Sequence, residues 1–134
     1  MSSTPPSSLK PRPLSPHLQV WKWSITMALS IFHRATGSVL AVGLLLLTWG
    51  AVSAAMGTDA YNQFLMCMTS PIGQLILAGW TFAIFFHMGT GTRHLIMDTG
   101  KLLTAKEGDA AGIIIILFAV LATAFTWVFV KGLI

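Results

Sequence analysis

Three runs of 21 consecutive residues without a formal charge constrain how this chain can fold: 35–55, 72–92 and 110–130. An α-helix of 21 residues is about 31 Å long, which matches the hydrocarbon thickness of a bilayer. The composition agrees, since 54% of the 134 residues are hydrophobic, 9% are charged and the mean hydropathy is +0.76. We therefore predict an all-α integral membrane protein with three transmembrane helices, at about residues 30–55, 72–97 and 110–131.

Two further parts of the chain complete this organisation. Residues 1–20 are rich in Ser, Thr and Pro, which predicts a flexible, extended N-terminal segment, and residues 21–134 form the three-helix domain. The first connection, 56–71, has room for a short interfacial helix near 61–68, and residues 100–109 favour a turn-prone loop. There is no internal repeat.

The basic residues indicate the orientation of the chain. Seven of the eight lie outside the runs on one predicted side of the membrane. They are Lys10, Arg12, Lys22 and Arg34 before the first run, and Arg93, Lys101 and Lys106 between the second and third. The positive-inside rule then places the N-terminus on the cytoplasmic or matrix side. The net charge of +4 thus reflects topology, and we expect no nucleic-acid partner.

A polar stripe interrupts the second run. His87, Gly91, His94 and Asp98 lie within about 60° of one another on a helix, whereas Arg93 points away. His87 is five residues inside the run, about 8 Å into the hydrocarbon, where an imidazole without a partner is costly. Cys67 is the only cysteine, so thiols of this chain alone cannot build a disulfide, a zinc site or an iron–sulfur site.

The stripe has more than one interpretation. His87 suits a haem ligand, and it equally suits a hydrogen bond to a neighbouring helix. His94 fits a boundary residue, Arg93 a topology anchor, and Asp98 a solvated helix end, a subunit contact or a proton carrier. A transporter would use the stripe as a proton path, but no second intramembrane carboxylate is present.

A second polar pair lies at the start of the first span. Ser30 and Arg34 are one helical turn apart, so a hydroxyl and a guanidinium share a face and could hydrogen-bond a carbonyl oxygen of a small ligand. A membrane anchor alone would also explain Arg34.

Two motifs together resemble a known family. The first is Arg12-Pro13-Leu14-Ser15-Pro16-His17 followed by Ser30-Ile31-Phe32-His33-Arg34-Ala35-Thr36-Gly37. The second is His87-(x)3-Gly91-x-Arg93-His94-Leu95-(x)2-Asp98. Over nearly the whole chain they resemble the cytochrome b556 subunits of succinate dehydrogenase, the larger membrane anchor of respiratory complex II.

The resemblance implies a role in a heteromeric helix bundle. It implies that His87 is an axial ligand of a haem b shared with a second anchor subunit, and that Ser30 and Arg34 bind ubiquinone. It implies that His33, Arg34 and His94 lie near the haem propionates, and that electrons arrive from an iron–sulfur subunit fed by a flavoprotein. The membrane is then the bacterial or mitochondrial inner membrane. Quinol:fumarate reductase and a purely structural anchor remain the alternatives.

The second haem ligand is also expected from a partner. His33 and His94 both lie near the inner membrane boundary, shallower than His87 by a turn or more, so neither is predicted to oppose His87 across a porphyrin.

Overall fold

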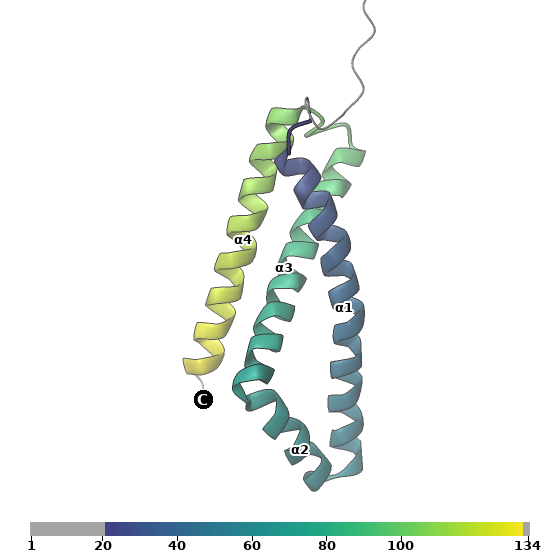
Figure 1. Ribbon diagram of the computed structural model, residues 1–134, viewed down its shortest axis with the longest axis vertical. Coiled ribbons are helices and arrows are strands. Elements are labelled where there is room, and N and C mark those ends of the chain that lie inside the picture. Colours follow the sequence, from purple (N-terminus) through teal and green to yellow (C-terminus); the bar gives the residue numbers. More distant parts are fainter. Residues whose placement is uncertain (1–20, 133–134) are drawn as a thin grey trace, which may run out of the picture.

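The computed structural model describes residues 21–132, and its helices follow one another with short connections. They are α1 (Ile25–Met56), α2 (Thr58–Thr69), α3 (Pro71–Asp98) and α4 (Ala105–Gly132), as Figure 1 shows. This confirms the all-α fold, since the described residues contain no strand. The prediction for residues 1–20 lies outside this part of the chain.

Three of the helices are long and apolar enough to cross a membrane, as predicted. They are α1, with 32 residues, and α3 and α4, with 28 residues each. At 1.5 Å per residue they are about 42–48 Å long, longer than the hydrocarbon layer, so their ends extend beyond it. α1 begins at Ile25, before the predicted span, because the side chain of Ser24 accepts a hydrogen bond from the Met27 N–H and caps the helix.

The first connection contains the predicted short helix. α2 has 12 residues and includes residues 61–68. Gly57, with φ +111°, makes the turn between α1 and α2, a conformation that residues with a side chain rarely adopt. Ser70 then caps α3 through the Gly73 N–H, with Pro71 in the first turn of that helix.

The second connection is shorter than predicted. α4 begins at Ala105, so the turn-prone region occupies 99–104 and not 100–109. The reason is a reciprocal cap: the Glu107 N–H donates to the Thr104 hydroxyl, and the Thr104 N–H and hydroxyl both donate to the Glu107 carboxylate. This extends the helix beyond the uncharged run by about one and a half turns.

α3 is the central helix of the bundle. In Figure 1, α4 lies along one side of α3, and α1 crosses close to α3 near its own first turns and then diverges from it toward α2. We call the end that holds the first turns of α1 and α4 the N-terminal end. The hydrophobic core between the helices contains Leu29, Phe86, Ile115 and Ala119, with Phe82 and Phe85 packed against it. The phenylalanine cluster of α3 is therefore packing surface.

Candidate functional site

Three histidines gather between α1 and α3. The rings of His33 and His87 are stacked, with centroids 4.1 Å apart and planes 12° apart. His94 lies two helical turns after His87 on the same face of α3, and its ring centroid is 5.1 Å from that of His33. The structure thus brings together the three candidate site histidines, although His33 lies more than 50 residues before the other two.

The His87 ring is held by two oxygen atoms of α1. Its Nδ1 lies 3.2 Å from the His33 carbonyl oxygen and 3.3 Å from the Thr36 hydroxyl oxygen. The Thr36 hydroxyl already donates its hydrogen to the carbonyls of Phe32 and His33, at 2.8 and 2.9 Å. Neither oxygen has a hydrogen to give, so His87 Nδ1 must be the donor. In a neutral imidazole the Nε2 atom then carries the free lone pair, which is the form that binds a metal ion.

The depth argument for His33 was wrong. His33 lies level with His87, not a turn or more shallower. The reason is that α1 begins at Ile25, so two turns of helix precede His33, and the start of the uncharged run did not mark the end of the helix. The two stacked rings leave no space for a flat ligand between them. His33 therefore cannot oppose His87 across a porphyrin, which leaves the expectation of a partner's histidine standing.

Small residues surround the His87 ring. A Cβ at Gly37 of α1 would lie 3.2 Å from His87 Cε1, so glycine permits this close approach. On the other side, one turn along α3, a Cβ at Gly91 would have no neighbour within 4 Å. The stripe is thus closed toward α1 and open beside Gly91, and it continues to the exposed residues His94 and Asp98.

Ser30 and Arg34 lie at the edge of this face. Both side chains are exposed, and Arg34 Nε is 3.4 Å from the Ser30 carbonyl oxygen, to which it donates a long hydrogen bond. By helical spacing Ser30 is about 20° from Gly37, so the pair borders the histidine cluster. The guanidinium has further donors that are free to bind a ligand on this side of α1.

The residues fit a haem, by the chemistry of their donors. No group of three or more His, Cys, Asp or Glu side chains within 21–132 is arranged to hold a metal ion. A haem iron needs fewer ligands from the protein, because the macrocycle supplies four of them. This chain then needs to supply only one imidazole nitrogen, on one face of the macrocycle. His87, with Nδ1 bonded to oxygens of α1 and Nε2 left to accept a metal ion, meets that requirement.

Two residues have structural positions that the sequence did not predict. Thr36, one turn after His33, orients His87, and only its place in the first motif hinted at it. Arg93 was interpreted as a topology anchor, but its side chain is only 7% exposed. It packs toward α4, where Gly108 leaves room for it.

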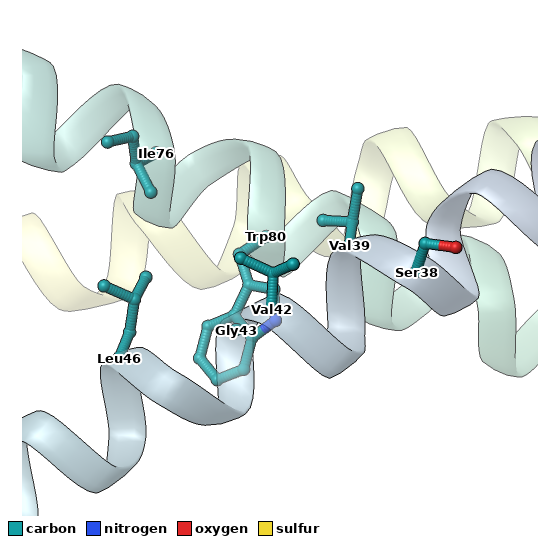
Figure 2. A pocket seen from close by; sticks show the side chains of 7 residues that line it. All are labelled: Ser38, Val39, Val42, Gly43, Leu46, Ile76 and Trp80. Atoms are coloured by element: carbon teal, nitrogen blue, oxygen red, sulfur yellow. The ribbon is translucent and has the colours of Figure 1, made fainter.

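Further from the N-terminal end, α1 and α3 enclose an apolar groove of about 280 Å³ (Figure 2). Figure 2 shows the Trp80 indole of α3 lying across Gly43 of α1, with Val42 and Leu46 nearby. The indole Nε1 is buried and has no hydrogen-bond partner in the described structure. A Cβ at Gly43 would overlap this ring, so the contact depends on glycine.

Comparison with known proteins identifies the family. Residues 8–126 match the family model described as succinate dehydrogenase/fumarate reductase transmembrane subunit. The chain belongs to this family. The match covers most of the sequence and confirms the resemblance that the two motifs suggested.

Individual relatives agree with this assignment. The succinate dehydrogenase cytochrome b556 subunit of Paracoccus denitrificans is 34% identical over 115 residues, covering 86% of this chain and 88% of the relative. That of Rickettsia felis is 32% identical over 128 residues, 96% of this chain and all of the relative. The mitochondrial cytochrome b560 subunit of Sus scrofa is 32% identical over 114 residues, 84% of this chain and 68% of the relative.

Proposed function

We propose that this chain is the cytochrome b anchor of a succinate:ubiquinone oxidoreductase, and that it contributes one axial haem b ligand and part of the ubiquinone site. The observation that carries the proposal is the orientation of His87: two oxygens of α1 take the Nδ1 hydrogen and leave Nε2 free. The family supports it, because the relatives are named as cytochrome b subunits of succinate dehydrogenase.

The residues of the chain have separate tasks in this proposal. A bound haem would supply reversible one-electron transfer. His87 Nε2 would hold the iron, and Thr36 and the His33 carbonyl keep the ring in one orientation. His33, Arg34 and His94 would donate hydrogen bonds to the propionates, since the His33 and His94 rings lie close to one another and Arg34 follows His33 in α1.

Ser30 and Arg34 would position the quinone. The Ser30 hydroxyl and the Arg34 guanidinium present hydrogen-bond donors one turn apart on an exposed face. A carbonyl oxygen of ubiquinone held by this pair would gain negative charge on reduction, and the fixed positive charge of Arg34 would stabilise it. The protons that complete the reduction to quinol would enter from the cytoplasmic or matrix surface.

The partners follow from the same proposal. An iron–sulfur subunit and a flavoprotein would deliver electrons from succinate, and a second small anchor would supply the histidine that His33 cannot. The chain would lie in the bacterial or mitochondrial inner membrane with its N-terminus on the cytoplasmic or matrix side. The relatives include both bacterial and mitochondrial proteins.

One alternative is the reverse reaction, because the family description also names fumarate reductase. The same groups would then bind quinol and pass electrons toward fumarate. The names of the relatives favour succinate oxidation. Measuring both directions in the purified complex would decide between the two reactions.

The direct test is the optical spectrum of the complex with His87→Leu. We expect the reduced-minus-oxidised bands of haem b to be lost or shifted, because leucine has no ligand nitrogen. Met88→Leu is the matched control, since Met88 is the next residue on α3 and is half exposed. An unaltered haem spectrum in an assembled His87→Leu complex would return His87 to a packing role.

A further inference from the structure

A second groove lies on the other side of α3, toward α4. It has a volume of about 540 Å³ and is lined by residues of α3, α4 and the loop between them. By helical spacing its α3 residues face away from the histidine stripe, so it is separate from the candidate haem and quinone site. Its walls are apolar except for Thr92 and Arg93.

Arg93 gives this groove a buried positive charge. The side chain is 93% buried, and its Nε has no hydrogen-bond partner in residues 21–132. A Cβ at Gly108 would lie 3.0 Å from Arg93 Nη2 and 2.9 Å from a methyl group of Thr26, so the guanidinium fills the junction of three helix ends. A buried guanidinium without an anionic partner is costly, and an anion in the groove would remove that cost.

The acidic side chains around Arg93 are directed elsewhere. Asp109 Oδ1 accepts a hydrogen bond from the Thr26 N–H at the start of α1, at 3.3 Å. Glu107 accepts from Thr104 in the cap of α4. Asp98 is exposed and lies on the histidine stripe of α3, about 140° around the helix from Arg93. The neutralising group is therefore best sought outside this chain.

We propose that this groove binds an anionic phospholipid, with its phosphate on the Arg93 guanidinium and an acyl chain between α3 and α4. Charge complementarity favours this occupant, because a fork of guanidinium donors matches a phosphate. Apolar walls favour it as well: from Ala111 to Phe118 they extend about 10 Å along α4, toward the centre of the membrane.

Two local features shape the groove for such a ligand. Gly89 lets Ile115 approach α3, since a Cβ there would lie 2.9 Å from that side chain, and this closes the floor. Leu102 lines the groove from the loop and has a φ of +57°, a conformation that is unfavourable for leucine.

Lipid retention by the purified complex tests the proposal. We expect wild-type complex, washed in detergent, to retain anionic phospholipid, and Arg93→Gln to retain about tenfold less. Arg93→Lys should fall between them, because lysine keeps the charge and loses the bidentate fork. Lys101→Gln is the matched control, since it removes the same charge from the exposed loop and should keep most of the lipid.

A second variant keeps Arg93 and fills the groove. Ala111→Phe should reduce retention of the lipid while the haem spectrum stays unchanged, because Ala111 lies away from the histidines. Its complex can be examined even where Arg93→Gln does not assemble. Detergent micelles that contain phosphatidylglycerol should raise the Tm of wild type and not of Ala111→Phe, whereas detergent micelles that contain phosphatidylcholine should raise neither.

Three results would overturn the proposal. The first is that wild type, Arg93→Gln and Ala111→Phe all retain the same amount of anionic phospholipid. The second is an equal rise in Tm with inorganic phosphate, which would assign Arg93 to a free anion. The third is loss of a partner subunit from Arg93→Gln with no change in bound lipid, which would assign Arg93 to an acidic group of that subunit.

Discussion

Two oxygen atoms of α1, the His33 carbonyl and the Thr36 hydroxyl, decide how His87 can act. Thr36 gives its hydrogen to the carbonyls of its own helix, as threonines in membrane helices commonly do, and its oxygen is then left to accept from His87. The imidazole is thereby fixed in one tautomer before any ligand arrives. The sequence predicted the helical face on which His87 lies, because that depends on helical spacing alone. It could not predict Thr36 or the position of the His33 ring, which depend on how α1 meets α3.

For Arg34, we predict that Arg34→Ala lowers quinone reductase turnover by about 100-fold, since it removes the positive charge proposed to stabilise the reduced quinone oxygen. Arg34→Lys should restore part of the rate, because it keeps the charge. Succinate:quinone reductase activity measures this, with succinate oxidation by a water-soluble acceptor as the internal reference. Lys22→Ala, an exposed cation of the same end of the chain, is the control. Wild-type turnover and quinone affinity in Arg34→Ala would rule out the role.

Among the helices, the uncharged runs located the three spans, but the true ends came from caps. Ser24, Ser70 and Thr104 begin α1, α3 and α4 with side-chain hydrogen bonds, and each helix extends beyond its apolar run. These extensions put His33 two turns inside α1 and bring Gly108 opposite Arg93. Arg93 shows what could not be predicted from the sequence. Helical periodicity correctly predicted that Arg93 points away from the histidine stripe, whereas the burial of its side chain depends on where α4 begins.

At the scale of the helix pair, Gly43→Ala should destabilise the complex by about 1–3 kcal/mol, because the new Cβ overlaps the Trp80 indole. Gly79→Ala is the matched control, since a Cβ there meets nothing within 4 Å, and it should be neutral or stabilising. Thermal unfolding of the purified variants measures the difference. In a Trp80→Leu background the cost of Gly43→Ala should shrink. Equal Tm values for the two alanine variants would show that the Trp80 contact does not limit how α1 and α3 pack.

The whole molecule presents its polar groups on a face that the chain does not cover itself. Ser30, Arg34, His94 and Asp98 are exposed at the N-terminal end, and His87 is only half-buried between α1 and α3. Of these groups His87 lies deepest within its uncharged run, where an imidazole exposed to lipid would be costly, so the proposed haem and second anchor would cover this face. Gly91, where an added Cβ would meet nothing within 4 Å, is on the same face of α3 as His87.

We therefore predict that the chain expressed without a second anchor does not retain haem b with two histidine ligands, whereas the chain expressed with that anchor does. His33 cannot replace the missing ligand, because its ring is stacked on His87 at 4.1 Å. Reduced-minus-oxidised spectra and the haem content of the two preparations measure this. Removing the ligating histidine of the anchor should reproduce the result for the lone chain. A six-coordinate haem b spectrum from the lone chain would contradict the prediction, and it would require α1 and α3 to separate so that His33 could turn to the iron.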